Sequence, residues 1–295
     1  MVVWEQYELL CGRGRETTYG IEGIPPCLER NAEIAKPTEY LKSIGMRYRL
    51  AVSIGVLLLW TGVSAIVGHF TAGQERSIVQ FVSHGVAWPI ICAAGLLILV
   101  LRAFQWPDVG FQRFRILQAL QLLWLPIVYL CIFGGMLAVV GLPPTDVVLF
   151  IVINACLVGF SEEVMFRGIL FTGLRSRLGV WSSIWIGCAV FGLIHILNAV
   201  QTGHLAAALL QAVAAFMTGT MFMALRLRTG SLYPVIILHA TWDCLPLLIA
   251  THVDTTNLDR PLSGLMYLSP LLVLPNLLYA LYLLRPKGLA RVTLT

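Results

Sequence analysis

Eight apolar segments of about 20 residues each dominate this chain and constrain what it can fold into. An α-helix needs about 20 apolar residues to cross a bilayer, and the backbone of a segment in lipid must satisfy its own hydrogen bonds. The chain is 58% hydrophobic and only 12% charged, whereas soluble domains carry about 25% charged residues. The sequence therefore predicts an all-α, polytopic membrane bundle of about eight transmembrane helices. The segments lie near residues 50–69, 79–101, 116–140, 147–171, 181–199, 205–225, 232–250 and 265–284.

The basic residues alternate between the two sides of these segments. Seventeen of the 20 Lys and Arg residues lie before the first segment, in every second connection, or in the C-terminal tail. The opposite connections hold only Arg76 and Arg260, and Arg167 lies inside a segment. Because Lys and Arg are enriched in cytoplasmic loops, we expect both termini to be cytoplasmic. The net charge of +5 is spread between apolar segments and forms no basic face, which excludes nucleic acid as a partner.

The seven cysteines are scattered and include no C-x-x-C pair. This pattern predicts neither a disulfide framework nor a cysteine metal site.

Three charged residues interrupt the fourth apolar segment, at Glu162, Glu163 and Arg167. The residues between Asp146 and Glu162 carry no charge. A charge in hydrocarbon costs roughly 2.5–3.5 kcal/mol or more, so these residues need partners and a purpose. Glu163 and Arg167 are four residues apart and can form an ion pair on one helix face. Glu162 points about 100° away and lacks that partner. We therefore interpret Glu163 as structural and Glu162 as free for chemistry.

Two further polar groups lie in other apolar segments, as Phe191-Gly-Leu-Ile-His195 and His239-Ala-Thr-Trp-Asp243. Taken alone, His195 fits a hydrogen-bonded core histidine, and a His239–Asp243 pair could simply join two helices. Polar groups in three separate segments favour one shared pocket instead. At 1.5 Å per residue, Glu162 lies about 7 Å and His239 about 10 Å from the inner boundary, whereas His195 fits less well. This estimate favours a cavity in the cytoplasmic half.

The three groups resemble the motifs E-E-x-x-x-R, F-x-x-x-H and H-x-x-x-N/D of the CAAX-protease and bacteriocin-processing family. This family of intramembrane glutamic endopeptidases includes the type II CAAX prenyl endopeptidase, and the resemblance covers residues 147–249. It implies that Glu162 and His195 activate a water, and that His239 and Asp243 stabilise the oxyanion. It implies supporting roles for Glu163, Arg167 and Phe191, and neither a cofactor nor a metal.

Asp243 stands where the family has either Asn or Asp. An oxyanion stabiliser must donate a hydrogen bond, which an ionised Asp243 cannot do. It therefore either orients His239 or is itself protonated.

The resulting functional prediction is an intramembrane endopeptidase that hydrolyses a peptide bond with a water activated by Glu162 and His195. One alternative is a non-proteolytic scaffold or bacteriocin-immunity-type protein, which would have no need of a buried, unpaired Glu162. Another is a zinc-dependent membrane protease, since His195, His239 and a carboxylate would suffice in number. Against zinc, the chain has no H-E-x-x-H pair.

The expected partners are the lipid bilayer and a peptide or protein substrate, a lipidated C-terminal tail being one candidate. The expected location is the plasma (inner) membrane of a prokaryote, as an integral multi-pass protein. The expected organisation is a cytoplasmic segment 1–46, three transmembrane helices in 47–145, a catalytic core of four in 146–250, and a last helix with a basic tail in 251–295.

Overall fold

The computed structural model describes residues 37–71, 78–252 and 268–285. These residues form helices and their connections and contain no strand, which confirms the all-α prediction. The helices are α3 (Pro37–Arg47), α4 (Arg49–Thr71), α5 (Ile78–Ser83), α6 (Trp88–Phe104), α7 (Ile116–Leu122), α8 (Trp124–Val140), α9 (Thr145–Glu163), the π-helix η1 (Val164–Leu170), α10 (Phe171–Arg175), α11 (Val180–Ile194), the 3₁₀-helix η2 (His195–Leu197), α12 (Asn198–Thr202), α13 (Leu205–Thr229), α14 (Tyr233–Ala250) and α16 (Ser269–Leu283).

Five helices in the described ranges are long and apolar enough to cross a membrane: α4, Thr145–Arg175, Val180–Val200, α13 and α14. A sixth span arises if α7 and α8, which meet at a bend of 72°, are counted as one. The shorter apolar helices α6 and α16 occupy two of the remaining predicted segments. Every predicted segment thus contains an apolar helix, whereas the count of eight spans stays a prediction. Of the predicted N-terminal segment, residues 1–36 lie outside the described residues.

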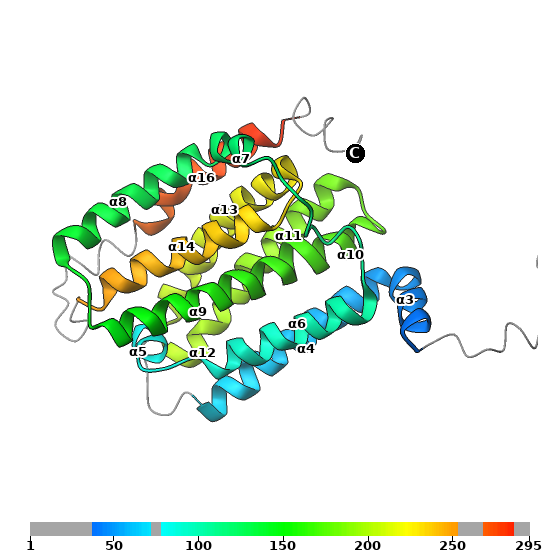
Figure 1. Ribbon diagram of the computed structural model, residues 1–295, viewed down its shortest axis with the longest axis horizontal. Coiled ribbons are helices and arrows are strands. Elements are labelled where there is room, and N and C mark those ends of the chain that lie inside the picture. Colours follow the sequence, from blue (N-terminus) through cyan, green and yellow to red (C-terminus); the bar gives the residue numbers. More distant parts are fainter. Residues whose placement is uncertain (1–36, 72–77, 253–267, 286–295) are drawn as a thin grey trace, which may run out of the picture.

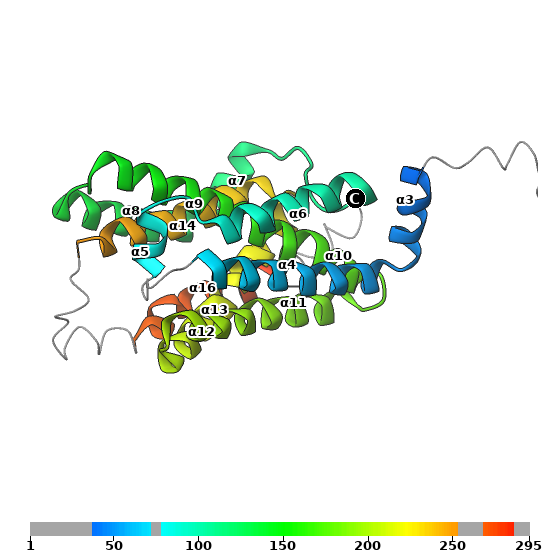
Figure 2. The ribbon, with the colours of Figure 1, turned by 90° about the horizontal axis from the view of Figure 1, so that it is seen from below.

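The long helices run side by side as an elongated bundle (Figure 1). The most extensively packed pairs are α13 with α16, α9 with α14, α11 with α13, and α4 with α6. Figure 2 shows α3 turned across the direction of the bundle, beside the start of α4. The start of α4, the end of α6, α10, the α13–α14 turn and the end of α16 all lie at one end (Figure 1). We call this the basic end, because it carries Arg47, Arg49, Arg102, Arg113, Arg115, Arg175, Arg177, Arg226, Arg228 and Arg285.

Hydrogen bonds between distant parts of the chain also join elements at the basic end. Arg228 Nη1 donates to the Leu283 carbonyl at 3.2 Å, and the Leu232 N–H donates to the Gly110 carbonyl at 2.8 Å. The grouping of basic residues therefore matches the alternation expected from the sequence. That this end faces the cytoplasm remains a prediction.

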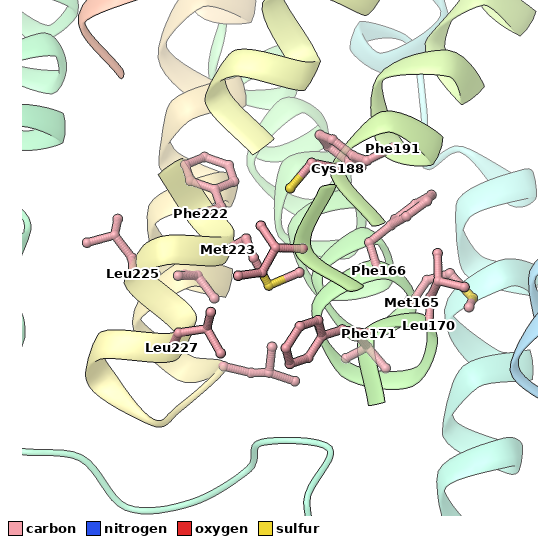
Figure 3. Packing of buried hydrophobic residues seen from close by; sticks show 14 of the residues in the cluster. Met165, Phe166, Leu170, Phe171, Cys188, Phe191, Phe222, Met223, Leu225 and Leu227 are labelled. Carbon is pink, nitrogen blue, oxygen red and sulfur yellow. The ribbon is translucent and has the colours of Figure 1, made fainter. Parts of the chain in front are cut away.

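The buried core lies between α13 and the helices of segment 145–194. Figure 3 shows Phe222 and Met223 of α13 facing Phe166 of η1 and Phe191 of α11. At Gly159, α9 approaches α14 so closely that a Cβ would lie 2.8 Å from the Ala240 nitrogen. Small residues allow such backbone contact between membrane helices. This contact brings the end of α9 against the middle of α14.

Candidate active site

A π-helix follows directly on the glutamate pair. Helix α9 ends at Glu163, and the next seven residues, Val164–Leu170, form η1 before α10 resumes the α-helix. All seven are buried. π-Helical turns are rare and are frequently found at functional sites. The turn changes the rotation between the residues before it and those after it, so side-chain directions here depart from a regular α-helix.

The predicted ion pair of Glu163 and Arg167 is confirmed. Arg167 Nη1 lies 2.9 Å from Glu163 Oε1, and the two side chains are 1% and 0% exposed. Arg167 Nη2 donates to the Gly219 carbonyl at 3.0 Å, and its guanidinium lies 4.0 Å from the centre of the Phe191 ring. A carboxylate, a carbonyl and an aromatic face together replace water around this cation.

His239 is a second partner of Glu163 that the sequence analysis missed. Its Nδ1 lies 2.7 Å from the same Glu163 Oε1 that accepts from Arg167. Because a carboxylate accepts, Nδ1 carries the hydrogen. Glu163 Oε2 is buried without a hydrogen-bond partner among the described residues. The close approach of α9 and α14 at Gly159 places these two side chains together.

The other nitrogen of His239 faces two further carboxylates. Nε2 lies 3.4 Å from Asp243 Oδ2 and 3.7 Å from Glu162 Oε2. The first contact confirms that His239 and Asp243 share a face of α14. The second gives Glu162 a neighbour across the bundle, although it has none at the i+4 position of its own helix. At 3.7 Å this is a charge contact and no hydrogen bond, so the Glu162 oxygens remain available.

His195 stands where α11 gives way to η2. Its Nδ1 donates to the Phe191 carbonyl at 2.7 Å, which leaves Nε2 of the neutral ring as a hydrogen-bond acceptor. The residue lies within electrostatic reach of Glu162. The F-x-x-x-H spacing thus has a local function, because the Phe191 carbonyl fixes the histidine tautomer.

Exposure divides the site residues into two groups. Glu163, Arg167 and His239 are buried, with at most 6% of each side chain exposed. Glu162 and Asp243 are partly exposed, at 19% and 32%, and His195 is also intermediate. The second group is thus more accessible than the first, which lies in the interior of the bundle.

The apolar span that holds Glu162 is longer than the segment 147–171 expected from the sequence. The helix does not end near residue 171 but continues through η1 and α10 to Arg175, which is 13 residues beyond Glu162, or about 20 Å. His195 lies 15 residues from Val180, or about 22 Å, so Glu162 and His195 are at similar distances from the Arg175 and Val180 ends of their helices. His239 is close to the start of α14 because residues 108–110 cover that start, where Leu232 bonds Gly110.

Aromatic rings surround the site, and the sequence analysis identified only Phe191 among them. The Phe222 ring lies 5.0 Å from His239, and the Trp60 ring lies 5.7 Å from Phe166. Trp60 Nε1 also donates to Ser161 Oγ at 2.8 Å, next to the glutamate pair. No signal singles these residues out, because aromatic residues are common in apolar segments.

A catalytic zinc site would need three protein ligands around one ion. Within the part of the chain that the structure describes, no three His, Cys, Asp or Glu side chains are grouped so that they could hold a metal ion.

Comparison with known proteins gives a family for the central segment. Residues 144–245 match the family described as type II CAAX prenyl endopeptidase Rce1-like. No curated protein and no solved structure matches the chain. The matched segment runs from the start of α9 into α14 and contains all three motifs. Residues 144–245 are therefore similar to the CAAX prenyl endopeptidase family.

Proposed function

We propose that this protein is an intramembrane endopeptidase of the CAAX protease type, with a glutamate and a histidine activating the attacking water. One observation supports the mechanism above all: His239 contacts the carboxylates of Glu162, Glu163 and Asp243, and His195 lies within electrostatic reach of Glu162. The family match supports the reaction class. Intramembrane ionisable groups mark functional sites by default, because their burial is costly.

Glu162 and His195 form the water-activating pair in this proposal. Glu162 has accessible oxygens and His195 offers Nε2, so a water between them can be held by two acceptors. The water oxygen adds to the peptide carbonyl carbon while its proton passes to the Glu162 carboxylate. The same proton then goes to the leaving nitrogen as the C–N bond breaks, which restores the carboxylate.

His239 is the proposed oxyanion donor. With Nδ1–H bound to Glu163, an imidazolium would present Nε2–H to the negative charge that develops on the substrate carbonyl oxygen. Asp243, at 3.4 Å from Nε2, would orient and stabilise that imidazolium before substrate binds. Arg167 serves this arrangement indirectly, because it holds the carboxylate of Glu163 in place.

The proposed substrate is a peptide or protein that reaches the site within the membrane, and a lipidated C-terminal tail is one candidate. The proposed location is the plasma (inner) membrane of a prokaryote. The basic end would face the cytoplasm, since Arg residues are retained on that side.

Substrate trapping tests this function. A Glu162→Gln variant should bind proteins without cleaving them, and mass spectrometry of the retained proteins should identify candidates. Wild type should then cleave those candidates, with Asp146→Asn as a control in which an exposed carboxylate at the far end of α9 is removed. Retained proteins that wild type leaves intact would contradict the proposal.

A further inference from the structure

The connection between α6 and α7 lies directly on the π-helix. We call residues 106–110 the cap. Its Val109 is 2% exposed and belongs, like Ile169 of η1, to the buried hydrophobic core. A Cβ on Gly168 would lie 2.8 Å from Val109 Cγ1 and 3.5 Å from the Val109 carbonyl. The cap therefore rests on the residue that follows Arg167.

Three helices hold the cap in this position. Arg49 of α4 donates both terminal nitrogens to the Asp108 carboxylate, one of them at 2.9 Å and the other through the Nη2–Oδ1 pair. The same guanidinium lies 4.6 Å from the centre of the Trp106 ring. At the start of α14, the Leu232 N–H donates to the Gly110 carbonyl at 2.8 Å.

Helix α13 contributes the third contact through Arg226, which is 7% exposed. Its Nη2 donates to the Val109 carbonyl at 3.2 Å, and its Nε has no hydrogen-bond partner among the described residues. Gly110 has φ of +120°, and any side chain there would collide with this guanidinium. Within the described ranges, Asp108 is the carboxylate whose charge acts on Arg226 as well as on Arg49. One half-exposed carboxylate thus balances two buried guanidinium groups.

We propose that the cap is a positioning element for the candidate active site, and that Asp108 is the residue on which its position depends. The inference rests on the proposed function, and extends it to residues outside the matched segment 144–245. Asp108 holds the cap, and the cap presses Val109 against Gly168. Gly168 adjoins Arg167, whose guanidinium holds the carboxylate of Glu163.

Asp108→Asn should reduce catalysis more than substrate binding. The ion pair between Asp108 and Arg49 would be lost, and with it the negative charge that acts on Arg226, so the cap should move off η1. A misplacement of about 1 Å costs about 100-fold in rate, so we expect kcat to fall about 10- to 100-fold with KM changed less than about 3-fold. Asp108→Glu, which keeps the charge, should retain most activity. The control Asp146→Asn should behave as wild type.

A second pair of variants tests the contact itself and is independent of the ion pair. Gly168→Ala places a methyl group against Val109 and should lower kcat about 10-fold or more, following the same geometric argument. Val109→Ala removes the methyl group that it meets. The double variant Gly168→Ala/Val109→Ala should therefore be faster than Gly168→Ala alone. A double variant as slow as Gly168→Ala alone would overturn the proposal that the cap acts through the contact of Val109 with Gly168, even if Asp108→Asn failed to fold.

Amide hydrogen exchange of residues 163–171 tests the cap without relying on activity. Asp108→Asn should exchange faster than wild type in this segment, while Asp146→Asn should not, because buried helical amides exchange only when the structure opens. Unchanged exchange in Asp108→Asn would overturn the positioning role. A wild-type protein with no peptidase activity but with the expected exchange difference would contradict the proposed function and leave the cap supported.

Discussion

Glu163→Gln should destabilise the protein far more than Glu162→Gln, although the two residues are neighbours and the substitution is the same. Glu163 is fully buried and its Oε1 accepts from both Arg167 and His239, at 2.9 and 2.7 Å. Glutamine can keep one acceptor there but removes the charge. Breaking a buried ion pair costs about 3–5 kcal/mol, because the remaining charge has no counter-charge.

Because Arg167 has other contacts, we expect the loss in the free energy of unfolding to lie near the lower end of that range. Its guanidinium keeps the Phe191 ring at 4.0 Å and the Gly219 carbonyl at 3.0 Å. A cation–π contact contributes about 0.5–2 kcal/mol. We expect Glu163→Gln to lose about 3 kcal/mol. Glu162→Gln should lose about 1 kcal/mol or less, because its side chain is partly exposed and its ion contact with His239 is 3.7 Å long.

The assay is the free energy of unfolding of the purified variants in mixed detergent micelles. The double variant Glu163→Gln/Arg167→Met should regain part of the loss, because it removes the buried cation that the single variant leaves unpaired. Equal losses in Glu162→Gln and Glu163→Gln would refute the division into a structural and a chemical glutamate. So would a double variant that is no more stable than Glu163→Gln.

Three further predictions concern the site and its orientation. Asp243→Asn should keep substantial activity, whereas Asp243→Ala should lose about 100-fold, the scale of one oxyanion donor; an unchanged rate in Asp243→Ala would remove the residue from the site. Elemental analysis should find no stoichiometric zinc, and a metal whose removal abolishes activity and whose return restores it would establish the metalloprotease alternative. Reporter fusions near Arg177 and Arg228 should read as cytoplasmic and a fusion after Leu142 as external; an external reading at Arg228 would contradict the topology.

The grouping of polar residues could be predicted from sequence because each pair repeats at a spacing of four. Glu163 with Arg167 and His239 with Asp243 are local pairs, so helical geometry alone places each pair on one face. The apolar segments could be predicted equally well. A charge in lipid is costly, so membrane-spanning segments consist of long runs of apolar residues. The local sequence pattern was therefore sufficient to predict the apolar helices and the polar pairs within each helix.

The contacts between helices could not be predicted from the sequence. That His239 bonds Glu163 depends on the approach of α9 to α14 at Gly159, and a single glycine does not reveal its partner. The π-helix has no known signature in the residues that form it, and it carries the chain on to Arg175. The apolar span of Glu162 therefore ends later than the predicted boundary at residue 171. The cap was missed because its buried arginine contacts join residues more than 50 positions apart.

The role proposed for Glu162 is to activate the water that cleaves the peptide bond. Its most direct test is the cleavage rate of a trapped substrate by wild type and by Glu162→Gln, with both proteins shown to be folded by the same unfolding measurement. We expect cleavage by wild type and none above background by Glu162→Gln. Equal cleavage rates in the two proteins would contradict it.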